Sequence, residues 1–364
     1  MKRILLTAGP IPARLDSVKF LTNRFKGGLS LKTAHYLRDQ GHDVTLVAWK
    51  HNALQTDLPI IPIVDVMDYY RTVLDFEADA YILAAAVANL MPSNPYEGKF
   101  PSHNYQVGEK FNIEFEIAPR VIDDIKKRHP RSTLVGYKLY DGDHDHLIAA
   151  AKKTLFDSLG NVVFANHPAW AKDRKIALTQ DGAVFETTFD EHCRLIDQIV
   201  RAEFYKSTIT PNEIVLNEME QFVVDHYPSY PLDGRTYGTF AVRRDNGFIT
   251  TTRGKKEGNK AVSLVHRVNH DTHTVEASNK ATLNAPLLDQ MFALNPHLNI
   301  LYHGHELKGR IVHDGYEFAG GTGDLNFACA IQSGEEILLP HHGFLVGFET
   351  LEQFKEYVGA HYGS

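Results

Sequence analysis

The chain has 364 residues, of which 43% are hydrophobic and 23% are charged, and this length and composition are typical of a folded protein with two cores. The formal net charge is −7 without any basic block, which argues against a nucleic-acid partner. No apolar stretch approaches the ~20 residues of a membrane-spanning helix, and two cysteines, Cys193 and Cys329, give no disulfide framework, so we expect a cytoplasmic protein.

The first half of the chain alternates short apolar strands with helical segments. Strands are predicted at residues 4–8, 44–48, 60–64, 80–86, 133–137 and 162–165. Helices are predicted between them at residues 29–40, 66–76, 119–128 and 144–159. This alternation is typical of an α/β domain with a doubly wound, Rossmann-like parallel sheet. Ligands of such sheets bind at the carboxyl ends of the strands.

The predicted strand ends carry small residues and one long loop. Gly9 and Pro10 follow the first strand, and the run Ala-Ala-Ala-Val-Ala-Asn at residues 84–89 follows an inner strand. Small residues there let a ligand approach the backbone closely. The loop at residues 90–111 contains Lys99, and loops of this length are usually functional or mobile. There is no Walker A motif and no GxGxxG, so ordinary P-loop or dinucleotide binding is not indicated.

These segments together resemble phosphopantothenoylcysteine synthetase, a family of nucleotide-dependent ligases of coenzyme A synthesis. The resemblance spans roughly residues 2–200, with the motifs in the family's order and spacing. The family's ID-PVRF-ISN motif appears here as LDSVKFLTN at residues 15–23, and its AAAVAD loop appears as AAAVAN at 84–89. Its loop lysine is Lys99, its VGF segment is VGY at 135–137, and its AND segment is ANH at 165–167. The resemblance implies a ligase domain over residues 1–205.

The family activates a carboxylate with a nucleoside triphosphate, and an amine then displaces the nucleotide. By resemblance, Lys99 contacts the triphosphate and Asn23 supports breakdown of the acyl-nucleotide, roles that suit a mobile point charge and an amide donor. The backbone at 84–86 and Tyr137 hold the base. The implied nucleotide-binding residues, for CTP or ATP with Mg²⁺, are Gly9, Ala84, Ala85, Ala86, Asn89, Lys99, Tyr137 and Asn166. Considered alone, Lys99 is a solvated loop lysine and Asn23 a turn residue.

The first half departs from the family pattern at several positions. The glycine-rich GGT turn is Gly-Pro-Ile at residues 9–11, the loop aspartate is Asn89, and Phe-Pro-Ser at 100–102 replaces a second lysine pair. Residues 137–139, Tyr-Lys-Leu, resemble the eukaryotic FKLE variant more than the bacterial FAAE. These differences argue against 4′-phosphopantothenate as the acyl substrate. They leave CTP and ATP open, with CTP favoured.

A polar segment at residues 207–213 follows a predicted helix that ends near Phe204, and we place the domain boundary there, at 205/206. The second domain, 206–364, is predicted to be an α+β domain. Its predicted helices are at residues 214–224 and 282–294. Its predicted strands are at residues 237–242, 248–251, 262–268, 274–275, 300–305, 337–339 and 344–346.

The strand predicted at residues 300–305 carries His303 and His305. Residues two apart on a strand point to the same face, so the two imidazoles can share one metal ion. A third histidine, His342, lies between two apolar runs beside a glycine that permits a tight turn. Three neutral imidazoles with an open fourth position are typical of a catalytic zinc site. The chain has 20 histidines, so close pairs also arise by chance.

The second half resembles the class II aldolase/adducin family over roughly residues 211–360. The family's HxH and NHG motifs imply that His303, His305 and His342 bind Zn²⁺ or another divalent metal. Its phosphate loop and its KPSSE segment imply a backbone-rich pocket for a substrate phosphate. The residues of this pocket are Thr251, Thr252, Gly254 and Thr282. The catalytic glutamate of the family is Asn284 here, and a neutral amide cannot act as a general base.

Asp324 or Glu306 could supply a carboxylate instead, and retro-aldol cleavage, decarboxylation, epimerisation and dehydration remain open. We interpret the chain as a bifunctional enzyme: an acid–amine ligase fused to a zinc-dependent lyase that acts on a small phosphorylated or carbonyl substrate. The alternative is that one domain alone is catalytic and the other is a nucleotide-binding regulator or an oligomerisation scaffold. Both families assemble as oligomers, which implies a homo-oligomer.

Overall fold

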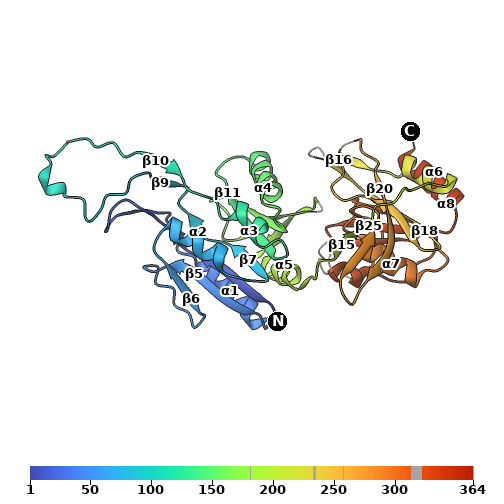
Figure 1. Ribbon diagram of the computed structural model, residues 1–364, viewed down its shortest axis with the longest axis horizontal. Helices are drawn as coiled ribbons and strands as arrows, with labels where there is room; N and C mark the ends of the chain where they lie inside the picture. Colours follow the sequence, from blue (N-terminus) through green and yellow to red (C-terminus); the bar gives the residue numbers. More distant parts are fainter. Residues whose placement is uncertain (181, 233–234, 257, 313–321, 364) are drawn as a thin grey trace. The chain divides into compact units, whose positions relative to one another are not determined.

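The structure is a computed structural model that describes residues 1–180, 182–232, 235–256, 258–312 and 322–363 (Figure 1). The chain divides into two compact units. Met1–Gln180 and Val184–Val200 form the first unit, and Asp181–Ala183 with Arg201–Ser364 form the second. Within the described ranges, no helix is long and apolar enough to cross a membrane.

The first unit is built on an eight-stranded sheet, and its parallel, Rossmann-like arrangement confirms the predicted fold. The strands lie in the order β14-β13-β12-β11-β7-β1-β5-β6. Their bounds are β1 Arg3–Ala8, β5 Asp43–Trp49, β6 Ile60–Ile63, β7 Ala80–Leu83, β11 Thr133–Leu139, β12 Val162–Asn166, β13 Arg174–Thr179 and β14 Val184–Thr188. The strands from β12 to β6 are parallel. An antiparallel hairpin, β13–β14, extends the β12 edge, and the apolar pattern did not reveal it.

Helices cover this sheet and bury its central strands. They are α1 Gly28–Asp39, α2 Val66–Asp75, α3 Ile122–Arg128, α4 His144–Ser158 and α5 Phe189–Arg201. Helices α2 and α3 pack against the core that contains Leu5 and Tyr81. Strand β1 is buried from Ile4 to Ala8, as expected for a central strand of a sheet with both faces covered.

Strand β1 lies where the order of the strands reverses. The chain leaves β1 toward β5 and β6 on one side and then continues through β7, β11 and β12 on the other. In such sheets the ligand binds in the crevice at the carboxyl ends of the strands at this switch point. Two short strands that directly follow β1 and β7 pair in parallel there, namely β2 (Pro10–Ile11) and β8 (Ala86–Val87).

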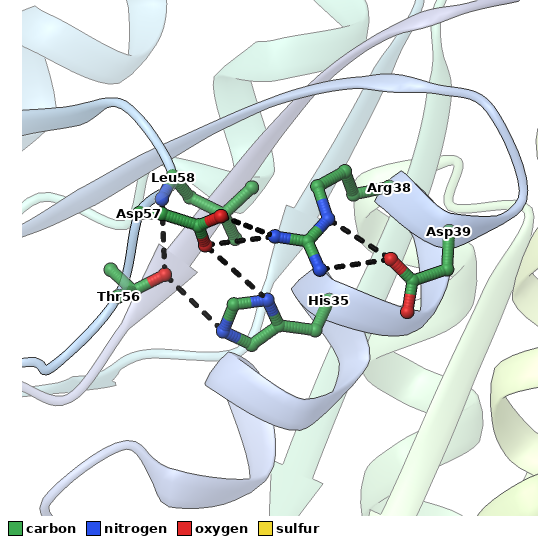
Figure 2. Close-up of polar contacts among 6 residues, drawn as sticks. All are labelled: His35, Arg38, Asp39, Thr56, Asp57 and Leu58. Carbon is green, nitrogen blue, oxygen red and sulfur yellow. Dashed lines mark hydrogen bonds and ion pairs between the residues drawn. The ribbon is translucent and has the colours of Figure 1, made fainter.

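Polar contacts hold the C-terminal part of α1 against the segment after β5 (Figure 2). The Arg38 guanidinium donates to Asp57 at 2.8 Å and to Asp39 at 2.9 Å. His35 Nε2 lies 3.2 Å from the hydroxyl of Thr56. The acidic partners are exposed, so each ion pair contributes about 1 kcal/mol or less. These contacts anchor the end of α1 that is remote from the switch point.

A long extension leaves the first unit between two short antiparallel strands, β9 (Leu90–Pro92) and β10 (Phe115–Ile117). It reaches away from the main sheet and contains a short 3-10 helix, η1 (Ser102–Asn104) (Figure 1). Aromatic rings with centroids 4.6–5.5 Å apart pack together inside it. They belong to Tyr96, Phe100, Tyr105 and Phe111. The extension therefore has a small apolar cluster of its own, next to Lys99.

The second unit is rich in sheet, as predicted. Its nine-stranded sheet has the order β15-β21-β20-β19-β18-β22-β25-β24-β23. The bounds are β15 Lys206–Ile209, β18 Thr239–Arg244, β19 Gly247–Thr251, β20 Val262–Asn269, β21 Thr274–Ala277, β22 Ile300–Gly304, β23 Arg310–Ile311, β24 Glu336–Leu339 and β25 Gly343–Phe348. Neighbouring strands from β21 to β24 are antiparallel. A separate hairpin pairs β16 (Tyr230–Leu232) with β17 (Arg235–Tyr237).

Helices pack on both faces of this sheet. They are α6 Glu218–His226, α7 Ala285–Leu294 and α8 Leu351–Tyr362, together with the 3-10 helix η2 Thr322–Phe327. Helix α7 packs on the face that carries Leu301, and α6 and α8 pack on the face that carries Tyr302. Successive residues of β22 therefore alternate between two cores. His303 follows this alternation onto the α7 face.

Candidate functional site

The backbone residues that were expected to bind a nucleotide meet at the carboxyl ends of β1 and β7. Gly9 directly follows β1, and Ala84 directly follows β7. The Ala85 N–H donates to the Thr7 hydroxyl at 3.0 Å, and the Ala86 N–H donates to the Gly9 carbonyl at 2.9 Å. Two main-chain N–H groups that follow β7 thus hold its end against the end of β1. We refer to this place as the β1–β7 junction.

The N-terminus of α1 reaches the same junction. Its N-cap residue is Gly27, which has a φ of 83°, and no side chain caps the helix there. A Cβ atom on Gly27 would lie 2.5 Å from the backbone nitrogen of Gly9, so this close approach requires glycine. Without a side-chain cap, the N–H groups of the first turn and the positive end of the helix dipole suit an anion such as phosphate.

The Asn23 side chain also reaches the β1–β7 junction. Its Nδ2 donates to the Ala86 carbonyl at 3.0 Å, and the side chain is half-buried. Asn89, in contrast, is exposed, and its backbone carbonyl accepts from the Ala118 N–H at 2.9 Å. The structure therefore brings Asn23 to the predicted nucleotide-binding backbone, while Asn89 lies at the surface.

Lys99 is exposed within the long extension. Next to it, the Phe100 N–H donates at 3.1 Å to the buried carboxylate of Asp16, which also accepts from the Lys19 ammonium at 2.8 Å. The Lys19 ammonium above all, and backbone N–H donors besides, keep the pKa of the Asp16 carboxyl well below its ordinary value. The segment that contains Asn23 and the segment that contains Lys99 are thus tied together through one carboxylate.

Tyr137 and Asn166 lie near the carboxyl ends of β11 and β12. The Tyr137 hydroxyl lies 2.7 Å from Nε2 of His192, a fully buried residue of α5. Burial keeps the pKa of His192 well below its ordinary value, so its imidazole is neutral. Both polar atoms of the Asn166 amide are hydrogen-bonded within the protein. Nδ2 donates to the Phe164 carbonyl at 3.2 Å, and Oδ1 accepts from the Lys175 ammonium at 3.1 Å.

Sequence reasoning does not identify His192 or Lys175. His192 lies on the buried face of α5 together with Leu195 and Ile199. A polar residue at a core position of the helical period is the signal that could have found it. Lys175 is 3% exposed, and burial lowers the pKa of its ammonium group to about 8. Nothing in its local sequence distinguishes it from a solvated lysine.

The second unit brings the three predicted metal ligands together. His303 lies on β22, His305 follows that strand, and His342 precedes β25. One ring nitrogen of each histidine lies within 4.8 Å of the others, and the ring centroids are 4.7–5.6 Å apart. They meet because β22 and β25 are antiparallel neighbours, with Gly304 opposite Phe344. We call these three residues the histidine cluster.

Local contacts keep the imidazoles in the form that binds a metal ion. His303 Nδ1 lies 2.8 Å from the Phe344 carbonyl, so Nδ1 carries the proton and Nε2 keeps its lone pair. Burial lowers the pKa of His342 to about 4. Burial also holds the pKa of His305 well below its ordinary value, and the charges of the other two histidines and of Lys255 add to this effect. Neutral imidazole is the metal-binding form.

This donor set fits zinc or a similar divalent metal. Imidazole nitrogens are preferred zinc ligands, with bonds of ~2.0–2.1 Å. Nitrogens that lie within 4.8 Å of one another need only small movements to converge on one ion. The backbone acceptor on His303 Nδ1 is also the outer contact that metal-binding histidines usually have.

A line of hydroxyl groups lies beside the histidine cluster. Thr239 on β18 is the cross-strand partner of His303. The Thr239 hydroxyl lies 3.0 Å from the Thr251 hydroxyl and 3.2 Å from the Thr282 hydroxyl. The Thr282 hydroxyl donates to Asn284 Oδ1 at 3.3 Å. Thr251 and Thr282, two of the residues predicted for the phosphate pocket, therefore lie near the histidine cluster together with Asn284. Thr239 belongs to the same line of hydroxyl groups, and the sequence did not identify it.

The other two residues predicted for the phosphate pocket, Thr252 and Gly254, lie after β19. The Thr252 hydroxyl donates to a backbone carbonyl at 3.3 Å, and Gly254 is exposed with a φ of 67°. Two cations that sequence reasoning missed lie on the same turn. Burial lowers the pKa of Arg253 to about 10 and that of Lys255 to about 7. The Lys255 ammonium donates to the carbonyl of Gly238, the residue that precedes Thr239 in the chain.

A cavity of about 500 Å³ opens beside His305. Its lining consists of Pro228, Ser229, Tyr230, Tyr302, His305, Glu306 and Tyr362. The Glu306 carboxylate lies 3.3 Å from the Lys308 ammonium, and its side chain is 57% exposed. The side chain of Asp324, the other carboxylate considered from the sequence, lies outside the described residues.

Comparison with known proteins bears on the first unit. Residues 1–192 match the family described as the DNA/pantothenate metabolism flavoprotein C-terminal domain, and they make up more than half of the chain. The chain belongs to this family. The matched residues contain the β1–β7 junction, Lys99, Tyr137 and Asn166, and they end before the histidine cluster.

Two curated relatives and one crystal structure are similar to the chain. The coenzyme A biosynthesis bifunctional protein CoaBC of Thermococcus kodakarensis is 28% identical over 170 residues, which cover 45% of this chain and 41% of that protein. CoaBC of Bacillus subtilis is 24% identical over 182 residues, which cover 48% and 44%. The chain thus spans less than half the length of these relatives. The DNA/pantothenate metabolism flavoprotein from Streptococcus pneumoniae aligns with a TM-score of 0.47 and 22% identity, over 54% of this chain and 96% of that one.

Proposed function

We propose that residues 1–205 form a ligase domain that activates a carboxylate with a nucleoside triphosphate, CTP in preference to ATP, and joins it to an amine. The observation that carries this proposal is the β1–β7 junction in a chain of this family. There, a helix N-terminus without a side-chain cap, a backbone with small side chains and the Asn23 amide meet at the switch point. The names of the CoaBC relatives, which refer to coenzyme A biosynthesis, support the same chemistry.

The proposed mechanism assigns each group a role that suits its chemistry. The first-turn N–H groups of α1 and the mobile ammonium of Lys99 bind the phosphates, with Mg²⁺ balancing their charge. A carboxylate oxygen of the acid attacks the α-phosphorus, and pyrophosphate leaves with the electron pair of the broken bond. The amine then attacks the acyl carbon, while Asn23 donates to the oxygen on which negative charge develops. The nucleoside monophosphate leaves, and the amine gives up a proton to water.

The nucleotide base is proposed to lie against Tyr137 and the backbone of Gly9, Ala84, Ala85 and Ala86. The contact between Tyr137 and His192 fixes the orientation of the tyrosine ring. Asn166 and Asn89 are proposed to border this pocket, and Asn89 removes the negative charge that the family's aspartate brings to the nucleotide. Together with the missing lysine pair after Lys99, this favours an acid other than 4′-phosphopantothenate.

Calorimetric titration with CTP, ATP, GTP and UTP, each with Mg²⁺, tests the ligase proposal. We expect saturable binding that is tightest for CTP. Lys99→Ala is expected to weaken it by roughly 10- to 100-fold, because a charge-assisted contact to phosphate is lost. Lys110→Ala removes another exposed lysine of the same extension and is the matched control. The ligase proposal fails when none of the four nucleotides binds to the wild-type protein.

The second domain, residues 206–364, is proposed to be a metal-dependent lyase, because the histidine cluster offers three converging neutral imidazoles. His303, His305 and His342 would hold Zn²⁺ or another divalent metal, which supplies a Lewis acid that polarises a carbonyl group. Thr251, Thr252, Gly254 and Thr282 are proposed to face a substrate phosphate, and Asn284 occupies the catalytic position. Measurement of zinc per chain after dialysis tests this proposal, and we expect one ion per chain. A wild-type protein that retains none contradicts it.

The second candidate is that one domain alone is catalytic and the other is a nucleotide-binding regulator or an oligomerisation scaffold. The neutral Asn284 at the position of a catalytic carboxylate favours this possibility for the second domain. We further propose a cytoplasmic homo-oligomer, which sedimentation velocity would test. Separate assays of the two domains distinguish the candidates, because a bifunctional enzyme turns over substrate at both.

A further inference from the structure

The hydroxyl line beside the histidine cluster runs from Thr251 through Thr239 and Thr282 to Asn284 Oδ1, with separations of 3.0, 3.2 and 3.3 Å. Each hydroxyl group has one proton to donate. The Thr282 proton goes to Asn284 Oδ1, so Thr282 accepts from Thr239, and Thr239 accepts from Thr251. The threonine protons are therefore all used within the line.

The amide at the end of this line has an open donor. Asn284 is 7% exposed, and its Nδ2 has no hydrogen-bond partner among the described residues. A buried donor is unfavourable unless something accepts from it. Asn284 is also the N-cap residue of α7, whose dipole adds positive potential at this point. Both features favour a ligand oxygen that carries negative charge.

The open donor lies on the same side of the sheet as the histidine cluster. Thr239 and His303 are directly opposite each other on neighbouring strands, so their Cβ atoms are about 4.5–5.5 Å apart. Thr282 is bonded to Thr239, and Asn284 is bonded to Thr282. Helix α7, which begins next to Asn284, packs on this face. One small molecule can therefore contact both the histidine cluster and Asn284.

We propose that Asn284 donates a hydrogen bond to the keto oxygen of a 3-oxo acid bound at the histidine cluster, and that the second domain decarboxylates this acid. The inference rests on the metal-dependent lyase proposed above. In the reaction, the carbon–carbon bond to the carboxylate breaks and CO₂ leaves. The electron pair of that bond forms an enolate, whose oxygen accepts from Asn284 Nδ2. A proton from water then adds to the carbon and gives the ketone.

Decarboxylation suits this site because it needs no general base. Retro-aldol cleavage starts with removal of a hydroxyl proton, and epimerisation starts with removal of a proton from carbon. Dehydration likewise takes a proton from carbon. A neutral amide cannot accept any of these protons. Glu306, a carboxylate on the cavity wall, is largely exposed and paired with Lys308. The amine of Lys255, a buried residue near the cluster, is already bonded to the Gly238 carbonyl and the Tyr227 hydroxyl. Among the described residues, Asn284 thus offers a buried donor without a partner beside the histidine cluster.

Oxalate binding to the zinc-loaded, full-length protein tests the role of Asn284. Oxalate is a planar dianion with adjacent oxygens and resembles an enolate. By calorimetry, Asn284→Ala is expected to weaken oxalate binding by roughly 10- to 100-fold. Asn284→Asp is expected to weaken it further, because a carboxylate replaces the donor. Asn299→Ala is the matched control, because the Asn299 amide donates to the Glu349 backbone carbonyl at 2.7 Å. The oxalate affinity of this variant is expected to equal that of the wild type.

Zinc content measured on the same samples separates the two proposals. A wild-type protein that binds no zinc overturns the metal-dependent lyase and, with it, the role of Asn284. Equal zinc in all variants with a selective loss of oxalate affinity at Asn284 supports the inference. Equal zinc with unchanged oxalate affinity in Asn284→Ala, or affinity retained in Asn284→Asp, overturns the role of Asn284 alone. The same conclusion follows if the zinc-loaded wild-type protein does not bind oxalate.

Discussion

The two units assemble their candidate sites from different materials. At the β1–β7 junction most of the groups are main chain, and they are positioned by Gly27, whose φ of 83° and close approach to Gly9 exclude a side chain. In the second unit the groups are side chains: the imidazoles of the histidine cluster and the hydroxyl line next to them. A main-chain site depends on local conformation, whereas a side-chain site depends on residue identity. The two sites should therefore respond differently to substitution.

The largest effect should follow from removal of one imidazole of the histidine cluster. His305→Ala is expected to weaken zinc binding by more than about 100-fold, since even loss of an outer contact costs 10- to 100-fold. Nucleotide binding by the first unit should not change. Competition with a chromophoric chelator measures the first quantity and calorimetry the second. His297→Ala, at an exposed histidine, is the control. Wild-type zinc affinity in His305→Ala would remove His305 from the ligand set.

The main-chain site should instead be sensitive to a single methyl group on the backbone. Gly27→Ala forces a side chain into a left-handed conformation and places its Cβ 2.5 Å from the Gly9 nitrogen, at a cost of about 1–3 kcal/mol. We expect weaker CTP binding by calorimetry. Gly28→Ala is the matched control, because a Cβ there meets no atom within 4 Å. Equal effects of the two substitutions would show that the junction does not depend on the close approach.

A buried lysine near the first site gives that unit a distinctive pH dependence. The pKa of Lys175 is lowered to about 8 by burial, whereas an unfolded lysine has a pKa of ~10.4. Between these pH values the unfolded state binds more protons, so the free energy of unfolding rises with pH, by at most about 3 kcal/mol. In Lys175→Met this rise should be smaller.

Urea unfolding followed by tryptophan fluorescence measures this rise. Both tryptophans, Trp49 and Trp170, lie in the first unit, so the signal reports on that unit. Lys126, whose pKa burial also lowers to about 8, contributes equally in both proteins and cancels in the difference. The same pH dependence in the wild type and in Lys175→Met would show that Lys175 is solvated.

The smallest effect is expected at the surface of α1. Arg38→Ala removes the exposed ion pairs with Asp57 and Asp39 (Figure 2) and should lower the free energy of unfolding by about 1 kcal/mol or less. CTP affinity should not change, because these contacts lie at the far end of the helix from the β1–β7 junction. Tryptophan-detected urea unfolding provides the measurement. A loss of CTP affinity would show that the junction depends on the whole helix rather than on its first turn.

The sequence predicts the order of strands and helices in the first unit because apolar runs alternate regularly with helical periods. It does not predict the β13–β14 hairpin, whose outer strand is largely exposed and lacks a continuous apolar run. The HxH pattern predicts the pairing of His303 with His305 from local geometry. The hydroxyl line could not be predicted in this way, because Thr239, Thr251 and Thr282 come from three segments that only the sheet brings together.

The central claim is that the β1–β7 junction binds a nucleoside triphosphate. Thermal unfolding detected by tryptophan fluorescence, with and without CTP and Mg²⁺, tests it most directly because the signal comes from the first unit. At about 100 times its dissociation constant, a ligand adds about 2.7 kcal/mol to the free energy of unfolding. We therefore predict a rise in Tm of roughly 5–11 °C. An unchanged Tm at millimolar CTP, ATP, GTP and UTP would contradict the claim.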